Sequence, residues 1–170
     1  MASINKISVK NIKRTNGHDG ASIWQCDIYR NGKKLGHAAQ DFMDGYTYFN
    51  FDENVLEKEI RSYVASDFVD KKYKDIIEAN CFIDTLVKLT EDERLWKKGI
   101  KYGYRTFVKG KIKGYIKEGY YTNEAPESIK NTETYATWIA SMQKKYGRGK
   151  EVEIAVTIYS DSSQFEIVTA

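Results

Sequence analysis

Residues 21–40 read ASIWQCDIYRNGKKLGHAAQ, and this stretch decides the fold of the first part of the chain. Apolar and polar residues alternate on both sides of Asn31-Gly32, as in two strands of an antiparallel sheet. Asn-Gly favours a two-residue type I′ turn because both central residues need positive φ. Such a turn fixes which residues face each other, and the paired residues then share one face. The predicted pairs are Ile28 with Leu35, Cys26 with His37, and Trp24 with Ala39.

A second turn signal, Asp44-Gly45, predicts that the meander continues with a further strand. With unbroken pairing, this turn would place Phe49 on the face opposite Trp24. Either both faces of the sheet are then covered, or a β-bulge flips the strand between Gly36 and Asp41. Small residues in that interval favour the bulge, and we predict it there.

Helical patterns follow the meander. Asp52 is predicted to cap the first helix, and a second pattern runs from Tyr73 to Val87. Thr90 and Glu93 have the spacing of a capping box, which predicts that a third helix begins there and ends at Gly103. The chain should finish with a helix that carries Tyr135, Ile139, Met142 and Tyr146 and is C-capped at Gly147, then a strand over 152–158 and a final SQFEIV segment.

These elements predict an α+β protein: an N-terminal antiparallel β-meander, a helical middle, and a C-terminal β-α-β region. With 170 residues the chain can fold as a single unit, 1–170. The alternative is two sub-domains. Residues 1–68 would form the meander plus a helix, and 69–170 the remaining helices plus a second small sheet.

The composition excludes several classes of protein. Hydrophobic residues make up 41% and charged residues 30% of the chain, which is typical of a globular protein and not of a disordered one. No apolar run approaches the ~18 residues that a membrane-spanning helix needs. The N-terminus lacks the apolar core of a signal peptide, and the two cysteines have no metal-binding spacing. We therefore expect a cytoplasmic protein with free, structural thiols.

Charge is distributed unevenly along the chain, although the net charge is only +3. Residues 41–92 carry thirteen acidic and six basic residues, whereas residues 93–121 carry two acidic and nine basic residues. The acids of the middle segment are mixed with lysines, as on a solvated helical surface. The basic segment is the clearer candidate for a binding surface.

Residues 104–121 read YRTFVKGKIKGYIKEGYY, and at a period of two they separate into a basic-aromatic face and a small, apolar face. The separation holds for one long strand or for a hairpin with an odd loop. Lysines on such a face could neutralise phosphates while aromatic rings stack on bases, could meet an acidic protein, or could only keep a sheet edge soluble. The candidate contact residues are Arg105, Phe107, Lys109, Lys111, Lys113, Tyr115 and Lys117.

No catalytic or cofactor motif is present in the sequence: there is no P-loop, G-x-G-x-x-G, G-x-S-x-G or H-E-x-x-H. The predicted register places His37 opposite Cys26. A metal site would need more ligands, and a reactive thiolate would need a base with an orienting group. We expect a structural histidine, and we predict no catalytic residue, metal or cofactor.

A family resemblance adds context to these patterns. ISVKNIKRTNGHDGASIWQCDIYRNGKKLG, residues 7–36, resembles the opening of uncharacterised small proteins of bacteriophages and mobile elements of Gram-positive bacteria. The shared features are an opening strand, a glycine-containing loop, a second strand and an NGKK hairpin. LVKLTEDERLWKKGIKYGYRTFVKG, residues 86–110, also resembles these proteins. The resemblance supplies no catalytic residues.

The resemblance implies a protein that acts inside a host cell by binding. The leading hypothesis is a non-enzymatic phage-type binding protein that acts on a host protein or protein–nucleic-acid complex, such as an inhibitor of host defence of the anti-CRISPR kind. The first alternative is direct binding of RNA or single-stranded DNA by the basic-aromatic face. The second is an enzyme with an unrecognised site near His37.

Overall fold

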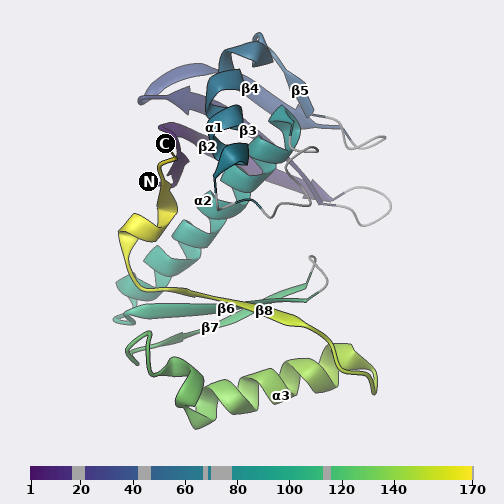
Figure 1. The fold of residues 1–170 in the computed structure, drawn as a ribbon, viewed down its shortest axis with the longest axis vertical. Coiled ribbons are helices and arrows are strands. Elements are labelled where there is room, and N and C mark those ends of the chain that lie inside the picture. The colour runs from purple at the N-terminus through teal and green to yellow at the C-terminus, as the bar shows by residue number, and fades with distance from the viewer. Residues whose placement is uncertain (17–21, 42–46, 67–68, 70–77, 113–115, 170) are drawn as a thin grey trace. The chain divides into compact units, whose positions relative to one another are not determined.

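The computed structural model describes residues 1–16, 22–41, 47–66, 69, 78–112 and 116–169, and their fold is α+β, as predicted (Figure 1). Strands come first, helices follow, and further strands flank the last helix. The chain divides into two compact units. Unit 1 comprises Met1–Glu93 and Phe165–Ala170, and unit 2 comprises Arg94–Gln164. The division falls after Glu93, within a continuous helix, whereas the alternative of two sub-domains placed it between residues 68 and 69.

Unit 1 contains a six-stranded sheet with the order β5-β4-β3-β2-β1-β9. Each hydrogen-bonded pair is antiparallel except β1 and β9, which are parallel. The first five strands follow one another as the predicted meander, and the last strand of the chain returns to pair with the first. The strands are β1 (Ser3–Ile4), β2 (Ile7–Asn16), β3 (Ser22–Arg30), β4 (Lys33–Gln40), β5 (Thr47–Phe49) and β9 (Glu166–Ile167).

The turn between β3 and β4 is the predicted one, since φ is +50° at Asn31 and +77° at Gly32. The predicted pairing beyond it is wrong by one residue. Tyr29 pairs with Lys34 and Ile28 with Gly36, so Leu35 is an extra residue on β4. A side chain at Gly36 would collide with Asn50 and Phe51, so only glycine fits there. The corrected pairs are Cys26 with Ala38, Asp27 with His37, and Gln25 with Ala39.

The bulge therefore lies at Leu35 and not in the predicted interval from Gly36 to Asp41. As expected of a bulge, it brings Phe49 to the face of the sheet that carries Trp24. Phe49 pairs with Ala38, and its ring packs on the core together with Phe51, at 5.5 Å between ring centroids. The predicted turn at Asp44-Gly45 lies outside the described residues.

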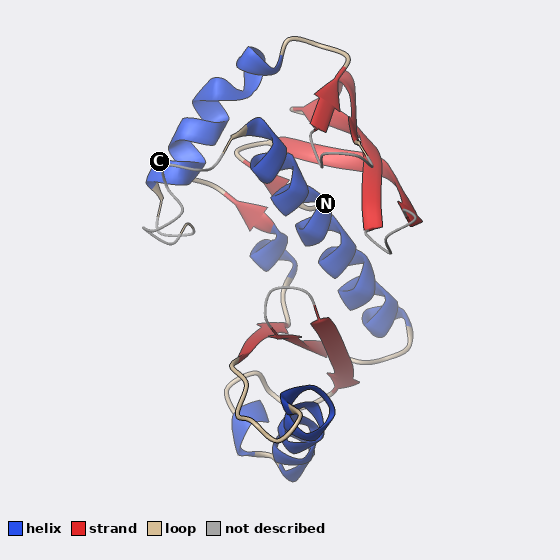
Figure 2. Cartoon of the chain, turned by 90° about the vertical axis from the view of Figure 1, so that its right-hand side faces the viewer, coloured by secondary structure: helices blue, strands red, loops and turns tan. Residues whose placement is uncertain are grey.

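One face of the unit 1 sheet is covered by helices (Figure 2). Asp52 accepts a hydrogen bond from the backbone N–H of Asn54 at 3.0 Å and so begins a 3₁₀ turn, Glu53–Leu56, that leads into α1 (Glu57–Ala65). The predicted cap is confirmed. Side chains of this segment and of residues 79–93 meet the sheet in one buried cluster. Its fully buried large members include Trp24, Ile28, Leu56, Phe82, Ile83 and Leu86.

The helix α2 (Ala79–Lys101) is continuous through Thr90, where a separate helix was predicted to begin. The Thr90 hydroxyl donates to the carbonyl oxygen of Leu86 at 2.8 Å, so it serves the helix interior and not a cap. Glu93 accepts from the backbone N–H of Ala2 at 2.7 Å instead of completing a capping box. Gly103, with φ of +87°, follows the helix end as predicted. Tyr73, Ile76 and Ile77 lie outside the described residues.

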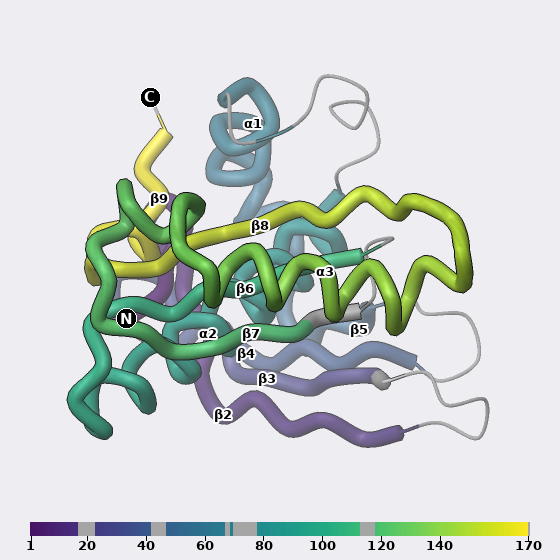
Figure 3. Tube along the Cα trace, turned by 90° about the horizontal axis from the view of Figure 1, so that it is seen from below, coloured from purple at the N-terminus to yellow at the C-terminus, as the bar shows by residue number. Residues whose placement is uncertain are grey.

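Unit 2 contains a three-stranded antiparallel sheet with the order β7-β6-β8, and α3 runs along its strands (Figure 3). The elements are β6 (Thr106–Ile112), β7 (Ile116–Thr122), α3 (Glu133–Gly147) and β8 (Ile154–Tyr159). The late helix and the strand after it are confirmed. Thr132 caps α3 by accepting from the backbone N–H of Tyr135 at 3.2 Å. The left-handed residue at the helix end is Arg148, one position after the predicted Gly147.

Candidate functional site

The candidate surface lies on the sheet of unit 2, where the predicted separation into two faces is present. Residues 113–115 connect β6 to β7, an odd number, so Lys111 pairs with Lys117 and Phe107 with Tyr121. These positions share one face, and β8 adds Ala155, Thr157 and Tyr159 to it. We call this the open face, since α3 packs on the other one.

The covered face explains why the opposite side is left for contact. Val108 and Ile112 are buried there. A Cβ atom at Gly110 would lie 2.8 Å from Cη2 of Trp138 and 3.0 Å from Sδ of Met142. Gly110 therefore allows α3 to approach the strand closely, and α3 occupies this face along its length.

One end of the open face is aromatic and closed. Phe107 is only 5% exposed, and its ring lies 5.1 Å from that of Tyr121 and 6.3 Å from that of Tyr159, centroid to centroid. The last turns of α2 cover this end, since the Tyr121 hydroxyl donates to the carbonyl oxygen of Leu95 at 3.0 Å. Phe107 therefore belongs to the interior of unit 2 and offers no ring for stacking.

The other end of the open face is polar and accessible. Lys111 is exposed and Lys109 half-buried, while Ala155 and Thr157 on β8 are exposed. Of the remaining predicted contact residues, Arg105 is exposed just before β6, and Lys117 is placed by its backbone pairing opposite Lys111. Lys113 and Tyr115 lie outside the described residues.

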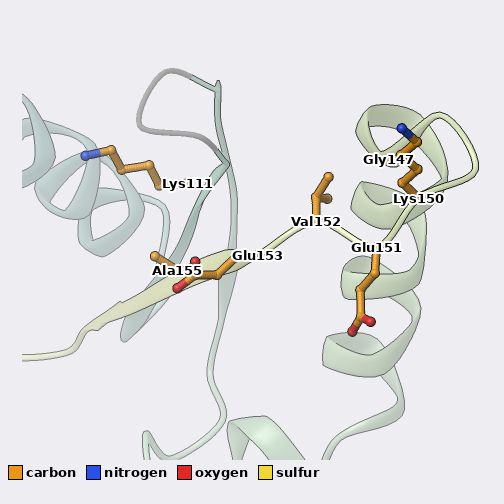
Figure 4. Close-up of a pocket in the computed structure, with 7 residues that line it drawn as sticks. All are labelled: Lys111, Gly147, Lys150, Glu151, Val152, Glu153 and Ala155. Carbon is orange, nitrogen blue, oxygen red and sulfur yellow. The ribbon is translucent and has the colours of Figure 1, made fainter.

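A hollow of about 490 Å³ borders this end of the sheet (Figure 4). Lys111 and Lys150 line it together with Glu151 and Glu153. Figure 4 shows the Lys111 side chain extending away from the loop that carries Lys150 and Glu151. The charged groups that line the hollow do not converge on one point.

A second polar cluster lies in unit 1, around Asp27. Its carboxylate accepts from Nζ of Lys34 at 2.8 Å, from Nδ2 of Asn11 at 2.7 Å, and contacts Nδ1 of His37 at 3.2 Å. These hydrogen bonds hold the pKa of Asp27 well below its usual range, and the bond from Lys34 contributes most to this shift. Asn11, with φ of +53°, lies where the β2–β3 pairing shifts register. The sequence could not reveal this cluster because it depends on two register shifts.

This cluster weakens the idea of a Cys–His site near His37. Cys26 points to the buried side of the sheet, opposite Ala38, while His37 faces Asp27. Burial raises the pKa of the Cys26 thiol to about 12, so it stays protonated at neutral pH. A hollow of about 440 Å³ borders His37, and it is lined by Asn11, Ile12, Lys13, Gln25, Asp27 and His37.

None of the helices among the described residues is long and apolar enough to span a membrane. Within the same residues, no group of three or more His, Cys, Asp or Glu side chains is arranged to hold a metal ion.

Comparisons with known proteins do not assign the chain. No protein-family model, no curated protein and no solved structure matches it. The case for a function therefore depends on the residues themselves.

Proposed function

We propose that this chain is a non-enzymatic binding protein that contacts its partner through the accessible end of the open face of unit 2. The observation that carries the proposal is that α3 covers only one face of the β7-β6-β8 sheet. On the other face Lys111, Ala155 and Thr157 are exposed.

The chemistry of this surface suits a broad, acidic partner. Lys111 and Lys117 are paired across β6 and β7, so two lysine positions lie side by side. Ala155, which pairs with Lys111 on β8, and Thr157, in the next row towards the aromatic end, are small and exposed, so a partner can approach the sheet there. Exposed cations steer an acidic partner and fix its register, while small neighbours add contact area at little cost in side-chain entropy.

The class of partner is proposed from the resemblance to phage and mobile-element proteins. In that context the partner is a host protein or a protein–nucleic-acid complex in the host cytoplasm, and binding inhibits a host defence. The charge of the surface supports an acidic contact and does not select one partner. Phe107, one of the rings predicted to stack on bases, is buried and does not offer its ring to a partner.

Affinity capture from a lysate of a Gram-positive bacterium, treated with nuclease, tests the proposal. The Lys111→Glu/Lys117→Glu variant should lose a partner that the unchanged protein retains, and binding to the purified partner should weaken about tenfold or more. Lys130→Glu/Lys144→Glu is the matched control, because it makes the same charge change at exposed positions near and on α3. Equal affinity of all three proteins for the partner would refute the assignment of this surface.

A further inference from the structure

Residues 94–105, RLWKKGIKYGYR, hold five basic and no acidic residues. Four of the five lie on the last two turns of α2, spaced three, one and three residues apart, so they project from one side of the helix. All four are exposed and together span about 10 Å along the helix axis. We call them the basic stripe: Arg94, Lys97, Lys98 and Lys101.

Packing inside unit 2 holds the basic stripe outward. The opposite side of this helical segment meets the aromatic end of the sheet, where a Cβ atom at Gly99 would lie 2.5 Å from the ring of Tyr121. Nε1 of Trp96 donates to the carbonyl oxygen of Arg105 at 3.4 Å, which ties the helix to the chain after the turn. The stripe is therefore presented on a supported element.

Exposed aromatic rings lie directly beyond the stripe. Tyr102 is 68% exposed and Tyr104 is 40% exposed. The Tyr104 ring stacks on Tyr121 at 5.6 Å, and Gly103 between the two exposed tyrosines turns the chain with φ of +87°. Rings held open beside a row of cations offer π-faces to planar groups.

The stabilisation of a helix end does not account for the basic stripe together with the exposed tyrosines. Cations near a helix C-terminus are favourable, which explains Lys98 and Lys101. Arg94 is two turns from the end, however, and exposed tyrosines gain nothing from the helix dipole. The earlier part of α2 differs, because its acids have cationic partners: Asp84 pairs with Lys88, and Glu91 with Arg14. Among the described residues, Arg94, Lys98, Lys101 and Arg105 form no ion pair.

We propose that the basic stripe and Tyr102 bind single-stranded nucleic acid. The cations contact successive phosphates, and the Tyr102 ring stacks on an unpaired base. A duplex could satisfy the cations but leaves no base free to stack, so the exposed tyrosine favours a single strand. This surface is separate from the accessible end of the open face, and the inference stands whether or not a protein partner binds there.

Fluorescence anisotropy with a labelled single strand of about twenty nucleotides, and with its duplex, tests the inference at 50 and 200 mM salt. The single strand should bind more tightly than the duplex. With four to five phosphate contacts its affinity should fall about a hundredfold between the two salt concentrations. No binding at 50 mM salt, or equal binding of the duplex, would overturn the proposal.

Variants then locate the contact. Arg94→Gln/Lys98→Gln/Lys101→Gln should remove most of the binding and flatten the salt dependence, while Lys130→Gln/Lys144→Gln/Lys150→Gln lowers the charge equally at exposed positions outside the stripe. Tyr102→Ala should weaken binding about tenfold and leave the salt dependence unchanged. Circular dichroism confirms that each variant is folded. An equal effect of the two triple variants would show non-specific attraction and refute the assignment of the basic stripe. Lys111→Glu/Lys117→Glu, which tests the proposed function, should leave the site of nucleic-acid binding on the stripe unchanged, so the two proposals can fail separately.

Discussion

The Asp27 cluster of unit 1 and the basic surfaces of unit 2 hold their exposed charges differently. In unit 1, Asp27 on the outer side of the sheet is hydrogen-bonded to Lys34 and Asn11 and contacts His37, so the charged groups satisfy one another. In unit 2, Lys111 and the basic stripe are exposed on surfaces whose opposite sides are packed. A charge network that is internally satisfied adds to stability, whereas exposed cations on a surface are accessible to a partner. The proposed binding surfaces therefore lie in unit 2, and the charge network that contributes to stability lies in unit 1.

The largest effect on the free energy of unfolding is expected from a substitution in the core of unit 1. Phe82 is fully buried, and its ring meets that of Tyr63 edge to face at 5.7 Å. Phe82→Ala should lower the free energy of unfolding by about 3–5 kcal/mol, measured by urea denaturation, because it leaves a cavity. The exposed Val168→Ala should change it by less than about 0.5 kcal/mol. A loss below about 1 kcal/mol for Phe82→Ala would show that this core is not tightly packed.

In unit 2 the close approach of α3 to β6 can be tested by adding a single carbon. Gly110→Ala should cost about 1–3 kcal/mol, because the new methyl group would lie 2.8 Å from Trp138. Combining it with Met142→Ala should cost less than the two single changes together, since the truncated side chain makes room. Strict additivity in thermal unfolding would indicate that the two residues are not in contact.

The charge network of unit 1 should make stability depend on pH. The folded-state pKa of Asp27 is lowered, so its ion pairs stabilise the protein above the unfolded-state pKa near 3.8, and this contribution is lost as pH falls through the folded-state value. Asp27→Asn should therefore lower the unfolding midpoint at pH 7, and the difference from the unchanged protein should shrink below pH 3.8. Glu127→Gln, at an exposed carboxyl group, is the control. A difference that stays constant from about pH 7 to about pH 2 would contradict the network.

The smallest effect is expected at Tyr120, whose hydroxyl oxygen is buried without a hydrogen-bond partner among the described residues. Tyr120→Phe removes a polar group that gains nothing in the folded state. The variant should be as stable as the unchanged protein or more stable by up to about 1 kcal/mol. A clear loss in calorimetric unfolding would reveal a partner for this hydroxyl.

Local signals in the sequence were sufficient where one short motif decides the structure. The Asn31-Gly32 turn, the Asp52 cap and the last helix are of this kind, since their hydrogen bonds form between near neighbours. Features that depend on distant side chains were not predictable. The extra residue at Leu35 depends on Phe51 packing against Gly36, and the burial of Phe107 depends on Tyr159, about fifty residues away in the chain. The basic stripe was visible as charge, but its outward orientation required the contact of Gly99 with Tyr121.

The pairing of β1 with β9 has a consequence for the order in which the protein can fold. Ser3 and Ile4 pair with Glu166 and Ile167, so the first-made strand needs the last-made one. Unit 2 is thus an insertion in the chain of unit 1, and its residues have left the ribosome before unit 1 can be completed. At a synthesis rate of roughly 5–20 residues per second, β1 waits about 8–30 seconds for its neighbour. During translation the edge of β1 that will receive β9 is therefore unpaired, and chaperone binding or premature association would act on that edge.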